Sequence, residues 1–276
     1  MNRNAASLIP NAAQANRSRF AKKYRVLLNQ QVKEVGQALR DGADITSVAA
    51  ELSKKHQVER ENFKLPWAIK YATEGWKLGG LVLGKKSFIA LYRGKAAQEA
   101  AVISAIENFG ADALVANQVG TEVGLWVETT STLETRVTAK RYEKLVEQAA
   151  VFLDKKGRGI TPRALAVAFE SQGLADTQVR SNLMARTLTN WSYNEGAISL
   201  YESEGIGGSE WVATIDDVTG EWDAELNGKI IGLRQPFVQS GDVFVGSGGN
   251  IVEAAFDVPH PPLHPNCRCT LVPVVQ

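Results

Sequence analysis

Cysteine and histidine are scarce in this sequence of 276 residues, which holds two of the former and three of the latter. Two cysteines separated by one residue do not make a disulfide framework, and this usage fits a reducing cytosol. Long apolar runs are also missing: no stretch of about 18 apolar residues occurs, so no transmembrane helix is predicted. The N-terminal segment has no apolar stretch long enough for a secretory signal. The sequence therefore predicts a globular protein without a membrane anchor.

The two ends of the chain differ in charge, although the net charge is only +1. Residues 1–95 carry 18 basic and 7 acidic side chains (+11), and the remaining residues carry 13 and 23 (−10). This asymmetry indicates a basic end that meets nucleic acid or an acidic partner. The alternative is a solvated helical surface, because the basic residues are dispersed. The candidate contact residues are Arg17, Arg19, Lys22, Lys23, Arg25 and Lys33.

Most of the first two hundred residues show helical periodicity. A long amphipathic helix is predicted over 14–40, followed by a short helix capped by Asp44 and a further helix that begins near Pro66. Another helix is expected between 95 and 120, ending in a glycine-punctuated turn, and one more over 131–156. Pro162 is predicted in the first turn of the next helix, and Asp176 or Thr177 at the cap of the one after it.

After Gly205 the chain changes to short segments, mostly rich in Val, Ile and Phe, separated by Gly, Pro and Asn turns. Helices and strands in separate blocks predict the α+β class. We expect helices over the N-terminal two-thirds, then a small, mostly antiparallel β-rich C-terminal part. The predicted division of the chain is into residues 1–125 and residues 126–276.

The stretch "PHPPLHPNCRCTLVPV" (259–274) gathers both cysteines and two histidines. His260, His264, Cys267 and Cys269 are ligand types that zinc accepts, although their spacing is not that of a standard zinc finger. Alternatively, the histidines and prolines build a turn while the cysteines pack as small apolar groups. A catalytic cysteine would need a base and an orienting group, and no third residue for that role is identifiable.

Three stretches occur in the order shown by one protein family: "RSNLMARTLTNWSYNEG" (180–196), "WVATIDDVTGEWDAELNGKII" (211–231) and "PPLHPNCRCTLVPV" (261–274). They resemble the C-terminal domain of phage head-morphogenesis proteins, the Mu F-like minor capsid family. The middle pattern of that family falls here on Trp211, Asp216, Thr219, Leu226 and Gly228, and its closing H-P-N-C-R-C motif falls on residues 264–269.

Two departures from the family pattern concern function. The family often has Cys or His at the positions of Gly220 and Asp223, and here only Asp223 can coordinate a metal. The zinc set that the resemblance implies is therefore Asp223, His264, Cys267 and Cys269. Leu188 stands where the helix motif has Glu, which removes a charged group. Both departures favour a structural domain over an enzyme.

The resemblance implies a minor capsid protein of a tailed phage or prophage, present near the portal vertex and acting in head assembly and in DNA packaging or delivery. Its expected partners are the portal protein, other head proteins and double-stranded DNA. Its expected location is the virion, after assembly in the host cytoplasm. Residues 1–125 would face portal or DNA, and 126–276 would form the Mu F-like domain. The alternative is a phage-encoded enzyme or effector, a hydrolase or transferase that uses the His/Cys cluster. A plain nucleic-acid-binding protein lacks support from any helix-turn-helix signature.

Overall fold

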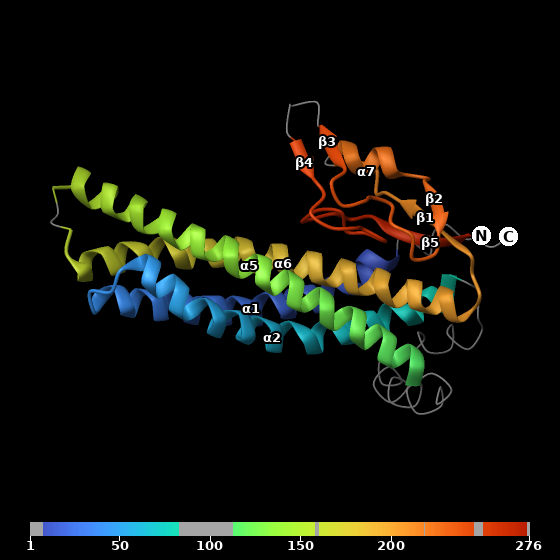
Figure 1. Cartoon of the computed structure of the whole chain (residues 1–276), viewed down its shortest axis with the longest axis horizontal. Helices are drawn as coiled ribbons and strands as arrows, with labels where there is room; N and C mark the ends of the chain where they lie inside the picture. Colours follow the sequence, from blue (N-terminus) through green and yellow to red (C-terminus); the bar gives the residue numbers. More distant parts are fainter. Residues whose placement is uncertain (1–7, 83–112, 158–159, 218, 246–250, 275–276) are drawn as a thin grey trace. The chain divides into compact units, whose positions relative to one another are not determined.

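The computed structural model describes residues 8–82, 113–157, 160–217, 219–245 and 251–274 (Figure 1). Four long helices come first: α1 (Leu8–Arg40), α2 (Ile45–Val82), α5 (Ala113–Lys155) and α6 (Pro162–Ser203). Shorter elements follow: β1 (Gly208–Val212), α7 (Glu221–Leu226), β2 (Ile230–Gly232), β3 (Val243–Val245), β4 (Ile251–Glu253) and β5 (Thr270–Val274). Helices followed by a small antiparallel sheet confirm the predicted α+β class. None of the helices in the described ranges combines the length and hydropathy needed to cross a bilayer.

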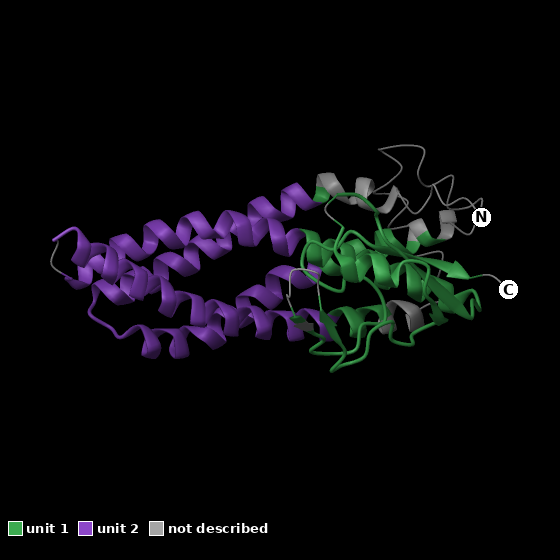
Figure 2. Ribbon diagram, turned by 90° about the horizontal axis from the view of Figure 1, so that it is seen from above, with its two compact units in different colours: residues 1–16, 68–123, 186–276 green, residues 17–67, 124–185 purple. Residues whose placement is uncertain are grey.

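The chain forms two compact units that are interleaved in sequence (Figure 2). Unit 1 comprises residues 1–16, 68–123 and 186–276, and unit 2 comprises residues 17–67 and 124–185. Each long helix thus contributes residues to both units. The functional division between residues 125 and 126 stays a prediction.

Unit 2 is built from one segment of each long helix. The link between α1 and α2 is short, and the Oδ2 atom of Asp44 accepts a hydrogen bond from the backbone N–H of Ser47 at 3.0 Å. This contact confirms Asp44 as the cap of α2. All four helices supply residues to one apolar core, made of Val32, Val35, Leu39, Val48, Tyr142, Leu145, Ala166 and Phe169.

In the described ranges the helices are longer than the sequence predicts, because predicted breaks lie inside continuous helices. Pro66 lies inside α2 and does not begin a helix. Proline removes one helical hydrogen bond, but Pro66 is exposed, and its neighbours Phe63 and Trp67 both pack on Phe20 of α1, with ring centroids 5.4 and 5.7 Å away. Packing on both sides of the proline therefore keeps one helix continuous.

The predicted cap at Asp176 or Thr177 is also wrong, because α6 runs unbroken from Pro162, which does begin the helix as predicted. Arg141 of α5 donates to Asp176 at 2.6 Å, and Thr177 donates to Asn29 of α1 at 2.6 Å, so both side chains make tertiary contacts instead of capping. The predicted glycine turn near residue 120 lies within α5. Much of the helix expected over 95–120 lies outside the described residues.

Unit 1 contains a three-stranded antiparallel sheet in the order β2–β1–β5 and a separate hairpin of β3 and β4. In β1, Ser209 and Trp211 are buried and alternate with half-buried neighbours. Trp211 belongs to a core that also holds Phe237, Val238, Cys267 and Cys269. The two cysteines are thus part of the apolar interior of this unit.

Roughly the last four turns of α6 form the centre of unit 1. Every residue from Leu188 to Tyr201 is buried. One side of this segment meets α2 so closely that a Cβ atom on Gly196 would lie 1.8 Å from the carbonyl oxygen of Ala72. On Gly75 of α2, a Cβ would lie 2.1 Å from the carbonyl oxygen of Tyr193. Another side packs on the sheet, where Ile198 and Tyr201 form a cluster with Leu271 of β5. Helix α6 is therefore packed on both sides.

Candidate metal centre

Three potential metal ligands converge inside unit 1. Asp223 lies in the first turn of α7, and Cys267 and Cys269 lie in the segment that leads into β5. One carboxylate oxygen of Asp223 and the two Sγ atoms lie within 4.8 Å of one another. All three side chains are buried, with exposed fractions of 2–4%. Residues 44 positions apart in the chain thus meet at one point.

His264 completes the group through Asp223. Its Nε2 atom donates to Oδ2 of Asp223 at 2.8 Å, and its Nδ1 atom donates to the carbonyl oxygen of Pro265 at 2.8 Å. The hydrogen bond with Asp223 raises the pKa of His264 to about 9. Burial would raise the pKa of Asp223, but His264 outweighs that effect and the pKa is lowered. The pair is therefore an imidazolium and a carboxylate at neutral pH.

The two thiols differ in their chemistry. Cys267 Sγ donates to Oδ1 of Asp223 at 3.4 Å. A hydrogen bond from Cys269 lowers the pKa of Cys267, and the same contact, together with burial, raises the pKa of Cys269. Cys267 is therefore the first of the two to become a thiolate, which is the form that binds metal.

The sequence H-P-N-C explains how His264 and Cys267 come together. The N–H of Cys267 donates to the carbonyl oxygen of His264 at 3.1 Å, which closes a β-turn with Pro265 and Asn266 at its centre. Asn266 has φ of 67°, a conformation that Asn tolerates better than most residues. Proline at the first central position of such a turn is pre-set to the required φ. The motif is thus a turn that places a histidine and a cysteine three residues apart on one site.

The loop before α7 is fixed against the same segment. Arg268, between the two cysteines, forms two hydrogen bonds of 2.5 Å to the carboxylate of Asp216. Thr219 donates to the carbonyl oxygen of Thr214 at 2.6 Å and accepts from the N–H of Asp216 at 2.7 Å. Arg268 is therefore a carboxylate clamp that fixes Asp216 in the loop before α7.

The donor set fits zinc. One carboxylate, one imidazole and two thiols are ligand types that structural zinc sites use, and three of the four atoms already converge in a buried position. His264 would join as a fourth ligand or orient Asp223 by its hydrogen bond, as outer partners of metal-bound carboxylates do. When bound, zinc would supply a cross-link between α7 and the segment before β5.

His260 does not join this group. Its Nε2 atom donates to Glu195 of α6 at 3.0 Å, and both side chains are buried. Arg234 also binds Glu195, at 2.7 Å. Burial would raise the pKa of Glu195, but the bonds from His260 and Arg234 lower it to about 2. Glu195 thus binds the buried His260 and the half-buried Arg234, an arrangement that the sequence motifs do not indicate.

Two asparagines of α6 hold the C-terminal segment from the other side. Asn190 donates to the carbonyl oxygen of Cys267 at 2.9 Å. Asn194 donates to the carbonyl oxygen of Pro261 at 3.2 Å and accepts from the Thr270 hydroxyl at 3.0 Å. Sequence reasoning missed both residues. The available signal was the N-x3-N spacing, which places two amide side chains one turn apart on α6.

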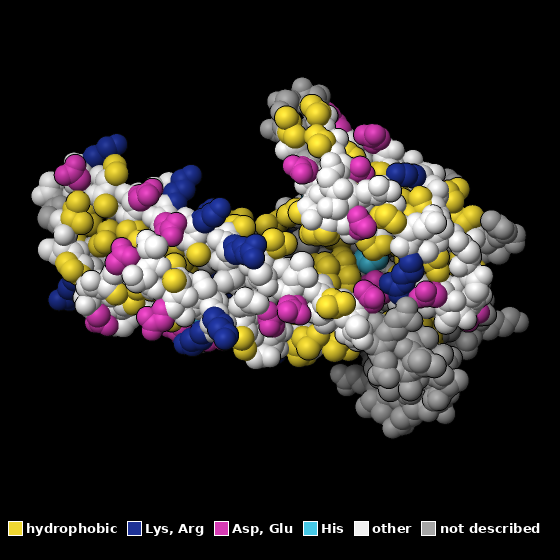
Figure 3. All heavy atoms as spheres, viewed as in Figure 1, with side chains coloured by type: hydrophobic (Ala, Val, Ile, Leu, Met, Phe, Trp, Pro, Cys, Tyr) yellow, Lys and Arg dark blue, Asp and Glu magenta, His cyan; other side chains and the backbone are white. Residues whose placement is uncertain are grey.

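The basic candidates on α1 lie in two different settings. Arg19, Lys22, Lys23 and Lys33 are exposed, and their spacing places them on one face of the helix. Arg17 and Arg25 are half-buried, and Arg25 donates to Gln178 of α6. On the face of the molecule shown in Figure 3, basic and acidic side chains are interspersed along the helices. A contact surface on α1 is thus limited to the four exposed cations.

A long helix, a small antiparallel sheet and a closing His-Pro-Asn-Cys turn make up the C-terminal part of the chain. Residues 138–272 match the model of the family described as phage Mu protein F like protein. This match confirms the resemblance to the phage Mu F-like family that the sequence motifs predict for the C-terminal part of the chain. No curated protein and no solved structure matches the chain.

Proposed function

We propose that the protein is a minor head protein of a tailed phage or prophage, present near the portal vertex in few copies and acting in head assembly and in DNA packaging or delivery. The observation that carries this proposal is the family match over 138–272, which includes the turn and both cysteines. The role proposed for the C-terminal site is structural. Its three converging side chains are at most 4% exposed, and a substrate could not reach them without local opening.

The test of this function is quantitative mass spectrometry of purified particles from the producing strain, with copies normalised to portal protein. A few copies per particle support the proposal. Absence from mature particles, with the protein present in assembling lysates, would support a factor that leaves before maturation. Absence from both would contradict the proposal and favour the alternative of an enzyme or effector.

Zinc is the metal proposed for Asp223, His264, Cys267 and Cys269. Protein purified without chelator should contain about one zinc per chain by elemental analysis, because thiolate sites bind zinc tightly. Cys267→Ser should remove most of it, since serine is a much poorer zinc ligand. Asp217→Asn, an exposed carboxylate in the nearby loop, is the matched control and should retain zinc. Equal zinc content in all three proteins would contradict the site.

The exposed face of α1 is proposed to contact the portal protein or packaged DNA. Arg19, Lys22, Lys23 and Lys33 lie on this face, and the only carboxylate of α1, Glu34, is half-buried and bound by Lys55 at 2.9 Å. Phosphates or acidic side chains would therefore meet uncompensated positive charge.

Charge reversal tests this surface. Changing Arg19, Lys22 and Lys33 to Glu should reduce incorporation into particles or their DNA content. The control reverses Arg136, Lys140 and Lys144, which are exposed on α5, with the same change in net charge. Unchanged particles from the α1 variant would contradict the assignment of this face, and an equal loss from both variants would show a general effect of charge.

A further inference from the structure

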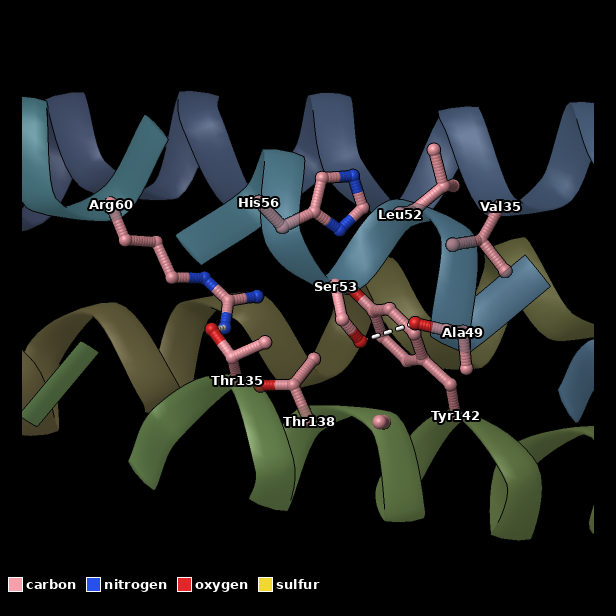
Figure 4. A pocket seen from close by; sticks show the side chains of 10 residues that line it. Val35, Ala49, Leu52, Ser53, His56, Arg60, Thr135, Thr138 and Tyr142 are labelled. Atoms are coloured by element: carbon pink, nitrogen blue, oxygen red, sulfur yellow. Dashed lines mark hydrogen bonds between the residues drawn. The ribbon is translucent and has the colours of Figure 1, made fainter. Parts of the chain in front are cut away.

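The small cavity of unit 2 belongs to the packing of its helices. Arg60 of α2 is fully buried, and its guanidinium donates to Gln31 and to Thr135. The cavity beside it has a volume of about 10 Å³, room for one water molecule, and Figure 4 shows the side chains that line it. A ligand larger than water therefore does not fit there.

Unit 1 carries the one Asn-Gly pair of the sequence, Asn227 and Gly228. Asn followed by Gly is the pair in which an asparagine side chain reacts most readily with the next backbone amide, because glycine has no side chain to hinder the approach. The Gly228 nitrogen loses its proton and attacks Cγ of Asn227, ammonia leaves, and a five-membered succinimide forms. Water then opens the ring at either carbonyl, which yields aspartate or isoaspartate.

The fold uses both residues of this pair. Asn227 (φ −60°, ψ 123°) and Gly228 (φ 83°) are the central residues of a turn that the N–H of Lys229 closes on the carbonyl oxygen of Leu226 at 3.0 Å. These angles match a type II turn, whose second central residue needs a positive φ and therefore favours glycine. Oδ1 of Asn227 accepts from the N–H of Ala213 at 2.9 Å. The labile pair thus links α7 to the end of β1.

The same contacts hold the two reacting atoms apart. Ring closure needs the Gly228 nitrogen and Cβ of Asn227 on the same side of the Cα–C bond, and a ψ of 123° turns the nitrogen away. The Gly228 N–H donates to the carbonyl oxygen of Trp211 at 2.8 Å, and Ala213 holds the Asn227 side chain. Both residues of the pair are exposed, so water and base can reach them. Geometry, and not burial, therefore prevents the reaction.

We propose that Asn227 is a conformation-gated site of spontaneous modification, stable while its turn is docked on β1 and converted to the succinimide when the turn leaves β1. The rate in the folded protein then equals the rate in a flexible chain multiplied by the fraction of time for which the turn is open. This property is independent of the function and of the zinc site proposed above.

Conversion to isoaspartate makes the opening irreversible. It inserts one carbon into the main chain inside the turn and moves the carboxylate to a different atom. The two hydrogen bonds with Trp211 and Ala213 then no longer match the spacing of the turn. The site thus records that the junction between α7 and β1 has opened.

Peptide mapping by mass spectrometry tests the gate in the full chain. The protein is incubated in mildly alkaline buffer, folded or in urea, in water enriched in the heavy oxygen isotope, which marks conversion that occurs during the incubation. Conversion of Asn227 should be at least about 100-fold slower in the folded protein, because opening of a hydrogen-bonded turn is rare. Nearly equal rates in the two states would overturn the gate, and absence of conversion in urea would overturn the site.

Leu226→Ala should increase the opening of the turn. Leu226 is 4% exposed and packs in the core with Trp211, so its truncation weakens the attachment of α7. Each conversion rate in the folded state is divided by the rate of the same protein in urea, and this ratio should rise at least about 10-fold in the variant. Ile230→Ala, an exposed change on β2, is the control and should keep the ratio of the parent. An unchanged ratio in Leu226→Ala would overturn the gate, and the comparison of the parent with and without urea does not depend on any variant folding.

The irreversible step is tested on converted chains. Chains that contain isoaspartate after incubation in urea are separated by ion exchange, refolded and compared with unconverted chains treated in the same way. Their midpoint of urea unfolding should be lower, because the altered turn cannot dock on β1. Equal midpoints would overturn the irreversible record.

Discussion

Asn194 offers the sharpest test of how helix α6 holds the C-terminal segment. The side chain is fully buried, and its Nδ2 atom donates to the carbonyl oxygens of Pro261 at 3.2 Å and of Asn190 at 3.0 Å. Its Oδ1 atom accepts from the Thr270 hydroxyl at 3.0 Å and from the N–H of Leu271 at 3.2 Å. One amide thus satisfies polar groups at the start of β5 and in the proline-rich turn.

Replacing Asn194 by Ala would leave two buried groups without this partner, the Thr270 hydroxyl and the Leu271 amide, whereas the Pro261 carbonyl keeps its hydrogen bond from Nδ1 of His260 at 2.7 Å. Each unsatisfied buried group costs about 1–3 kcal/mol. Relaxation and entry of water reduce the sum, so we expect a loss of about 2–4 kcal/mol in the free energy of unfolding. For a protein of this size, that corresponds to a fall in midpoint temperature of about 10 °C.

Urea unfolding followed by tryptophan fluorescence measures this loss. Asn182→Ala is the matched control, because Asn182 is exposed on the same helix and the change in helix propensity is the same. It should change the free energy of unfolding by less than about 0.5 kcal/mol. A loss below about 1 kcal/mol in Asn194→Ala would refute the reasoning, since the four hydrogen bonds would then contribute no net stability.

Three further predictions concern other parts of unit 1 and one glycine of unit 2. Gly196→Ala should destabilise the protein by more than about 2 kcal/mol, because the new Cβ meets a backbone carbonyl. Gly124→Ala on α5, where nothing lies within 4 Å of the new Cβ, should raise the free energy of urea unfolding by about 0.5–1 kcal/mol. A gain in stability for Gly196→Ala or a loss for Gly124→Ala would contradict the described packing. The pKa of Glu195 is lowered from 4.5 to about 2, so its ionised form stabilises the fold above pH 4.5, and this contribution is lost as the pH falls toward 2. Glu195→Gln should flatten the pH dependence of stability in that window, and an unchanged curve would exclude the residue as its source. A Cβ on Gly220 would lie 3.6 Å from both Asp223 Oδ2 and His264 Nε2, so Gly220→Cys should slow the loss of zinc to a chelator. If Gly220→Cys loses zinc as fast as the parent protein, the zinc ion does not lie beside residue 220.

The predictions that succeeded from sequence are those in which local signals agree with tertiary packing. Asp44 caps α2 because its carboxylate meets an N–H three residues later, a contact that the local sequence specifies. Pro66 and Thr177 are local signals that tertiary contacts override. Phe63 and Trp67 hold α2 together across the proline, and Thr177 finds a partner on α1 instead of capping α6.

The same distinction applies to the candidate site. The H-P-N-C turn could be predicted because its residues are adjacent in sequence, and the resemblance to a family supplied Asp223. The contact of Glu195 with His260 could not be predicted, because 65 residues separate the two and the residue type of His260 indicated only a possible metal ligand. Arg60 gave no signal either, since an arginine in a helix is normally exposed and only the packing of α1, α2 and α5 shows that this one is buried.

The interleaving of the two units has a consequence for the order of folding during synthesis. All of unit 2 has been made once residue 185 leaves the ribosome, whereas unit 1 needs the strand β5 to complete its sheet. Until β5 arrives, β1 has one unpaired edge, and the C-terminal part of α6 lacks the partners of Asn190 and Asn194. Exposed strand edges promote association between chains. A chain that stops before residue 270 would therefore carry a complete helical unit joined to an aggregation-prone one, and its defect would appear as insolubility before any loss of function could be measured.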